Sequence, residues 1–312
     1  MEKGNWFKKV LLGLLIASFV IGSVTFLMVN RLKTNGLEIK YEAAENGLAL
    51  KKYNGTSADK TLRIPDTAAD ENGRQQPVTA LGEFALSNSA YLEELHLGAN
   101  VAEIHVWAIS NCERLSKITV DENNPHFTAR DGVLYSRDMR TLLVYPNMAC
   151  YAFETDEKGE SVRDEDKNRV VRESAENGVF TVPEGVESIG ENAFYKCGRL
   201  TNIVFAASVR EVREKAFFKC KGLKALTLGA GFETIGVDAF AFCDNVEGEI
   251  RIPSGVKSIG QYAFFSNSSK VTGVLVDARK ETVTLGENWL PNKKGSRGKA
   301  VDCRFIENGE GA

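Results

Sequence analysis

The stretch Gly190-Glu191-Asn192-Ala193-Phe194, followed by Cys197, recurs along this chain of 312 residues at a nearly constant step. Its later copies are Ala216-Phe217 with Cys220, Gly236-Val237-Asp238-Ala239-Phe240 with Cys243, and Gly260-Gln261-Tyr262-Ala263-Phe264. The phenylalanines are 23, 23 and 24 residues apart. Self-similarity at this period is typical of a solenoid, in which each repeat forms one coil and stacks on the next.

The remainder of each repeat fits the same coil. A short triplet that mostly alternates apolar and polar residues predicts a half-buried strand, with its outer side chains in the core. These triplets are Leu95-His96-Leu97, Ile118-Thr119-Val120, Ile203-Val204-Phe205, Leu226-Thr227-Leu228, Ile250-Arg251-Ile252 and Val274-Leu275-Val276. Two apolar residues three positions apart follow each triplet, for example Val186 and Ile189 before the Gly190 turn.

The turn itself has three recurring positions. Glycine permits a tight or positive-φ bend, and alanine is small enough to let neighbouring coils approach. We expect the phenylalanine to fill the centre of the coil, so that the rings form one continuous hydrophobic spine through the molecule. A single coil cannot bury its own apolar side, and stability must therefore come from stacking.

Weaker copies extend the pattern in both directions. They are Gly82-Glu83-Phe84-Ala85-Leu86, Trp107-Ala108-Ile109 and Gly286-Glu287-Asn288-Trp289-Leu290. Two further phrases, Asn124-Pro125-His126-Phe127 and Asp131-Gly132-Val133-Leu134-Tyr135-Ser136, predict a β-hairpin inserted between coils.

From about Tyr41 to about Leu290 these motifs resemble the BspA-type leucine-rich repeat family of bacterial surface proteins. The resemblance implies an α/β-type repeat solenoid, right-handed and dominated by short parallel strands. It also implies a surface-exposed protein without enzymatic activity, some relatives of which act as adhesins. Since one fold hosts many ligands, the match is specific for fold rather than function.

The N-terminus differs in kind, because residues 10–29 carry no charge. As a helix this run would span about 30 Å, the thickness of a bilayer core. A cleavable signal normally has an apolar core of about 7–15 residues and a small-residue cleavage site, which this run lacks. We therefore expect an uncleaved, single-pass anchor with the N-terminus in the cytoplasm and the repeats outside the cell.

These observations predict the following organisation. The segments are a cytoplasmic N-terminus (1–9), a transmembrane helix (10–29), a linker with an N-terminal hairpin and capping unit (30–80), first repeats (81–120), an inserted hairpin and charged loop (121–180), main repeats (181–290) and a C-terminal cap and tail (291–312).

Reactive side chains give little sign of catalysis. Cys112, Cys197, Cys220 and Cys243 share one phase of the repeat, at spacings that fit no zinc pattern. We interpret them as buried thiols, although bridges between adjacent coils are compatible with the coil spacing. The three histidines have no catalytic partner at a suitable spacing, and we expect neither an enzyme nor a bound cofactor or metal. The net charge of −3 gives no reason to expect nucleic acid as a partner.

In a solenoid of this kind the parallel strands line one face. The outward residues of the triplets would then form a candidate ligand face for an extracellular protein or glycan. They are His96, Thr119, Val204, Thr227, Arg251 and Leu275. A second aromatic column beside the turns, Tyr195, Phe218, Phe242 and Phe265, we interpret as packing. A structural envelope spacer without a specific ligand is the alternative to a binding protein.

Overall fold

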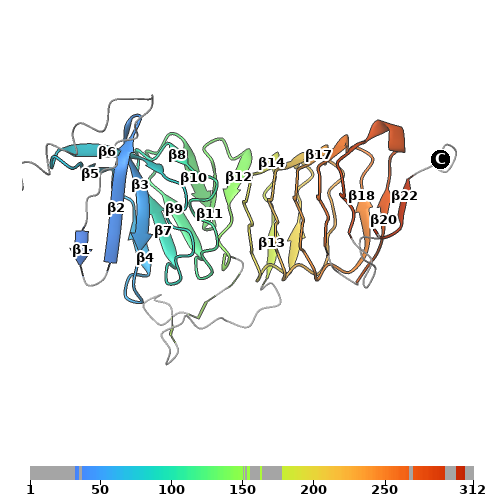
Figure 1. Ribbon diagram of the computed structural model, residues 1–312, viewed down its shortest axis with the longest axis horizontal. Coiled ribbons are helices and arrows are strands. Elements are labelled where there is room, and N and C mark those ends of the chain that lie inside the picture. The colour runs from blue at the N-terminus through green and yellow to red at the C-terminus, as the bar shows by residue number, and fades with distance from the viewer. Residues whose placement is uncertain are drawn as a thin grey trace, which may run out of the picture.

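The computed structural model describes residues 32–34, 37–149, 151, 153–154, 162–163, 178–266, 270–291 and 300–305. The chain forms an elongated stack that runs from the N-terminal strands, in blue, to the C-terminal strands, in red (Figure 1). Every regular element in these ranges is a β-strand except the 3-10 helix η1 (Lys280–Thr282). The dominance of short strands is confirmed, whereas the expectation of an α/β-type fold is wrong for this part of the chain.

The backbone of the turns explains the absence of helices. Each main repeat turn contains two non-glycine residues with positive φ four positions apart, such as Asn192 (φ 56°) and Lys196 (φ 58°). A helix cannot continue through such left-handed residues. The turns therefore remain irregular and leave room for close stacking.

The triplets form three separate parallel sheets. The first contains β4 (Thr61–Arg63), β7 (Glu94–Leu97) and β9 (Lys117–Val120); the second β13 (Val179–Thr181) and β15 (Asn202–Val204); the third β18 (Gly248–Ile252), β20 (Val271–Val276) and β22 (Cys303–Phe305). The last of these strands, β22, is a triplet that the sequence analysis did not recognise.

One predicted triplet is not a strand. Leu226 and Leu228 are buried as the alternation requires, but the segment pairs with neither neighbour as a regular strand. The next coil carries an extra residue, Gly248, at φ 83°, and the strand register shifts beside it. This shift accounts for the missing pairing on that side.

The paired apolar residues of the repeats form a second column of strands. It is an eight-stranded sheet in the order β10 (Phe127–Arg130), β11 (Val133–Ser136), β12 (Thr141–Val144), β14 (Ser188–Ile189), β16 (Glu211–Val212), β17 (Thr234–Ile235), β19 (Ser258–Ile259) and β21 (Thr284–Leu285). Pairing is parallel from β12 onward, residue for residue, as in Ile189↔Val212.

The N-terminal end is covered by a mixed sheet. Its strands are β1 (Leu32–Thr34), β2 (Leu37–Ala44), β3 (Gly47–Asn54), β5 (Thr67–Ala69), β6 (Gln75–Leu81) and β8 (Glu103–Ile104). β2 and β3 form an antiparallel hairpin, and β3 pairs in parallel with β6. This arrangement agrees with the predicted N-terminal hairpin and capping unit.

The insertion in the middle is a three-stranded meander rather than a hairpin alone. β10, β11 and β12 are antiparallel neighbours, and β12 then pairs in parallel with β14 of the main repeats. Part of the charged stretch that follows is fixed to the body, since Arg163 donates to both carboxylate oxygens of the buried Glu93 at 3.0 and 2.9 Å.

The buried core is divided in two, and the expectation of one continuous spine is wrong. One cluster extends from Tyr41 to Leu134 and the other from Val133 to Val301. The two meet on β11, where neighbouring side chains point to opposite faces of the strand. Aromatic plugs are confined to the second cluster, because Leu86 and Ile109 take the phenylalanine position in the first.

The turn glycines have a different role from the one expected. None of Gly190, Gly236, Gly260 and Gly286 has positive φ. A Cβ on Gly260 would instead lie 2.4 Å from the backbone nitrogen of Val237 in the preceding coil. Glycine is required there because two backbones touch.

The cysteines agree with the expectation of buried thiols. Cys112, Cys197, Cys220 and Cys243 are all free and buried. Each thiol donates to a carbonyl of the preceding coil, as Cys220 does to Phe194 O at 3.0 Å. Among the described residues no helix is long and apolar enough to cross a membrane, and the predicted span 10–29 lies outside them.

Candidate binding surfaces

The structure assembles the predicted ligand face only in part. His96 on β7 and Thr119 on β9 are in register, and His96 Nδ1 lies 3.0 Å from Thr119 Oγ1. Arg251 on β18 is likewise aligned with Leu275 on β20. The remaining two residues, Val204 and Thr227, are exposed but belong to neither pair.

The row is interrupted because the triplets lie in separate sheets. Thr119 belongs to the first sheet, Val204 to the second, and Arg251 to the third. Within each sheet the structure adds residues that the sequence analysis did not include: Arg63 beside His96, Thr181 beside Val204, and Arg304 beside Leu275. Arg304 could not be recognised because a loop of different period separates it from the last repeat.

The C-terminal part of this face carries alternating charge. Arg251 Nε donates to Asp277 Oδ2 at 2.5 Å, and an Arg304 guanidinium nitrogen donates to Glu249 Oε1 at 2.6 Å. Hydrogen bonding to Asp277 raises the pKa of Arg251 above its ordinary value. Leu275 lies between the two arginines in register, giving an apolar strip bordered by cations.

A second surface runs along the turns. The rings of Tyr195, Phe218, Phe242 and Phe265 follow one another at centroid distances of 5.6, 5.3 and 5.4 Å. Trp107, from the N-terminal repeats, packs edge-on against Tyr195 at 5.0 Å. The column therefore packs as the sequence analysis expects, and it also bridges the two halves of the molecule.

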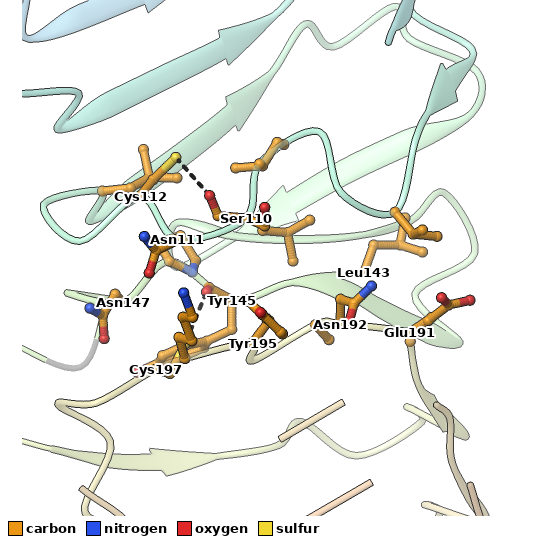
Figure 2. Close-up of a pocket in the computed structure, with 18 of the residues that line it drawn as sticks. Ser110, Asn111, Cys112, Leu143, Tyr145, Asn147, Glu191, Asn192, Tyr195 and Cys197 are labelled. Carbon is orange, nitrogen blue, oxygen red and sulfur yellow. Dashed lines mark hydrogen bonds between the residues drawn. The ribbon is translucent and has the colours of Figure 1, made fainter. Parts of the chain in front are cut away.

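Beneath that bridge lies a cavity of about 210 Å³, which we call the junction cleft. One wall is the turn at 105–113 of the N-terminal repeats, and the other is the turn at 190–197 of the main repeats. Figure 2 shows Ser110, Asn111 and Cys112 on the first wall, and Glu191, Asn192 and Tyr195 on the second.

The cleft exists because the coil between these walls is short. Tyr145 takes the position of the coil's phenylalanine: its ring stacks on Phe194 at 4.5 Å, and its backbone nitrogen donates to Ala193 O at 2.8 Å. From Leu142 to Tyr145 there are three positions, whereas the equivalent step from Ile189 to Phe194 has five. The missing outward bend leaves the two walls apart.

The short coil also leaves backbone groups without partners. Elsewhere each turn donates to the next, as Phe194 N does to Ala216 O at 2.7 Å. Across the junction cleft, the N–H groups of Ile109 and Asn111 find no acceptor among the described residues. On the facing wall, the carbonyls of Glu191 and Tyr195 receive no donor within the same part of the chain.

Asn192 is the least satisfied side chain of the cleft. It is 8% exposed, and neither its Oδ1 nor its Nδ2 has a hydrogen-bond partner within the described ranges. Its left-handed backbone (φ 56°) is a conformation that asparagine tolerates well. The same position holds Lys215, Asp238 and Asn288 in other turns, none of which is fully buried.

The charges at the cleft are mixed, and its floor is apolar. Glu113 and Glu191 are balanced by Lys196 and Arg213, while Leu143 and Val144 supply hydrophobic surface. Burial raises the pKa of the Cys112 thiol to about 12, so that it stays protonated and unreactive at neutral pH.

The sequence pattern described as "BspA type Leucine rich repeat region" matches residues 74–136 and 171–285 in six copies. These ranges include more than half of the chain, which therefore belongs to the BspA-type leucine-rich repeat family. Proteins of this family are typically bacterial surface proteins with roles in interaction.

Three solved structures illustrate what the chain is similar to. The pneumococcal vaccine antigen PcpA is 14% identical, with 91% of this chain and 95% of that chain covered and a TM-score of 0.43. A leucine-rich repeat protein from Eubacterium ventriosum is 14% identical, with 85% of each chain covered and a TM-score of 0.42. A leucine-rich cell surface protein from Faecalibacterium prausnitzii is 17% identical, with coverage of 81% and 96% and a TM-score of 0.34.

At these identities and scores, none of the three supports an argument about ligands. The comparison with curated proteins found no match.

Proposed function

We propose that this protein is a membrane-anchored, extracellular leucine-rich repeat protein that binds a protein or glycan partner through its strand face. The observation that carries the proposal is the in-register strip of Arg251, Leu275 and Arg304 on the third parallel sheet. An exposed apolar residue between two arginines offers both buried area and charge-assisted hydrogen bonds, which are common features of binding sites.

The location follows from the sequence and the family. Residues 10–29 are long and apolar enough to anchor the chain in a membrane as a single span. Surface exposure is typical of BspA-type repeat proteins. We infer that the C-terminal repeats lie outside the cell.

A structural spacer is the second candidate, and one observation favours it. Exposed charges of the repeats are matched within the chain, as Glu233 is by Arg210 at 3.3 Å and by Lys257 at 2.6 Å. A surface whose charges are already paired has less to offer a charged partner. In that case the repeats would serve to set a distance from the membrane.

Charge reversal on the strand face distinguishes the two candidates. The full chain in mild detergent would be applied to arrays of extracellular matrix proteins and cell-wall glycans, together with Arg251→Glu and Arg304→Glu. Loss of a charge-assisted contact should weaken capture about tenfold or more. Lys257→Glu is the matched control, because it reverses a similarly paired cation outside the strand face.

Capture that survives both reversals would exclude the third sheet as the site. If the parent protein captures no component of either array, the spacer is the better description.

A further inference from the structure

We propose that the junction cleft binds an extended, uncharged peptide segment of a partner protein, which inserts between the turns at 105–113 and 190–197. This site is distinct from the strand face and does not depend on it. The proposal rests on the shape of the cleft, on the polarity of its walls and on Asn192.

The size of the cleft fits a short segment. About 210 Å³ would hold about seven water molecules at roughly 30 Å³ each, and it falls below the roughly 300–1,000 Å³ of pockets for drug-sized molecules. Because the cleft occupies the place of an outward bend that the short coil lacks, its outline is that of a missing piece of polypeptide.

The hydrogen-bonding groups have the polarity that a peptide satisfies. The unpaired N–H groups of Ile109 and Asn111 on one wall require acceptors, and the carbonyls of Glu191 and Tyr195 on the other require donors. An extended backbone supplies carbonyls on one side and N–H groups on the other. The stacked turns use the same pairing elsewhere, as between Lys196 N and Phe218 O at 2.8 Å.

Asn192 adds a specific contact. An unpaired buried amide is costly, and its oxygen and nitrogen together match the N–H and C=O of one peptide unit. A ligand of this kind would convert the penalty into two hydrogen bonds. Ring systems with charged groups would leave the amide only half satisfied.

The floor and the rim select the side chains of the segment. Leu143 and Val144 favour a small apolar side chain that points inward. The rim carries both signs, so that a strongly charged peptide of either sign would meet repulsion from Glu113 and Glu191 or from Lys196 and Arg213.

The test begins with a phage-displayed library of random linear peptides, selected on the immobilised full chain in mild detergent. The enriched peptide would be synthesised and its Kd measured by fluorescence anisotropy. Asn192→Leu should weaken binding by roughly tenfold or more, as expected for a buried hydrogen-bonded group. Leu143→Trp, which fills the cleft, should abolish binding.

Asn288→Leu is the matched control, because Asn288 occupies the same turn position with φ 51° on an exposed turn. It should bind the peptide as the parent does, and so should Arg251→Glu. In hydrogen exchange, the peptide should slow the amides of Ile109 and Asn111 in particular.

Removing an unpaired buried amide should also raise stability in the absence of ligand, so that Asn192→Leu melts at a higher temperature than Asn288→Leu. The proposal is overturned if no enriched peptide depends on Asn192. It is also overturned if Asn192→Leu abolishes the binding of a glycan on an array instead.

Discussion

Phenylalanine at the centre of the coil is the residue on which the main repeats depend. The rings of Phe194, Phe217, Phe240 and Phe264 stack at centroid distances of 4.5, 5.0 and 5.4 Å, and all are at most 2% exposed. Each ring therefore contacts the coils on both sides. Its loss would leave a void that two neighbours share.

Phe217→Ala should lower the free energy of unfolding by about 3–5 kcal/mol, because the mutation removes a fully buried ring and leaves a cavity. Phe84→Ala is the control, since Phe84 is 55% exposed and its loss should change stability by about 0.5 kcal/mol at most. Urea denaturation of the two variants measures the difference. Equal midpoints would show that the ring column does not support the stack.

The residue types at the left-handed positions carried no usable signal. Asn192, Lys215, Asp238 and Tyr262 all adopt positive φ at the same point of the turn, with no chemical property in common. The sequence instead drew attention to the turn glycine, whose φ is ordinary. Backbone conformation here is imposed by stacking rather than by the propensity of the residue.

At the scale of the element, the turn glycine permits contact between coils. Gly260→Ala would place a Cβ 2.4 Å from Val237 N, and the backbone would have to shift at an expected cost of about 1–3 kcal/mol. Gly198→Ala is the matched control: its Cβ would have 3.9 Å to the nearest atom, and its φ is not positive.

Gly198→Ala should be neutral or stabilise by up to about 1 kcal/mol, because alanine has fewer conformations in the unfolded chain. Thermal melting of both variants tests the pair. Similar melting temperatures would mean that the coils separate easily at Gly260.

The regular turns could be predicted from the sequence, but the irregular one could not. The step of 23 residues located the coils at Phe194, Phe217 and Phe240 and the burial of their cysteines. The coil at Tyr145 lacks the glycine–alanine–phenylalanine phrase, and its shortening is visible only against known neighbours. The junction cleft arises from residues that are absent, which a search for recurring motifs does not detect.

At the scale of the whole molecule, buried thiols couple stability to alkaline pH. Burial raises the pKa of Cys112 from about 9 to about 12, and burial also raises that of Cys220. Below pH 9 the thiols are protonated in both the folded and the unfolded chain. Above pH 9 the unfolded chain releases these protons while the folded chain retains them, so that stability falls as pH rises.

The free energy of unfolding should therefore decrease between pH 9 and pH 10 by up to about 1.4 kcal/mol for each such thiol. Chemical denaturation at pH 8, 9 and 10 measures the slope. Cys112→Ala should reduce the slope by the share of one thiol. A free energy that stays constant over this range would contradict the buried, protonated state of the cysteines.

The division of the core has a molecular consequence of its own. The two clusters meet on β11, so that the N-terminal and main repeats each bury most of their apolar surface among their own residues. The sequence could not predict this boundary, because the repeat phase continues across it.

The parallel register from β14 to β21 makes the interval of 23 residues a unit of length. Excising one interval, such as 213–235, would set Gly236 directly beside Gly190 with equivalent partners above and below. The far end of the rod would then draw nearer by a single rung, while the junction cleft kept its geometry. Reach and recognition can accordingly vary separately in a protein built this way.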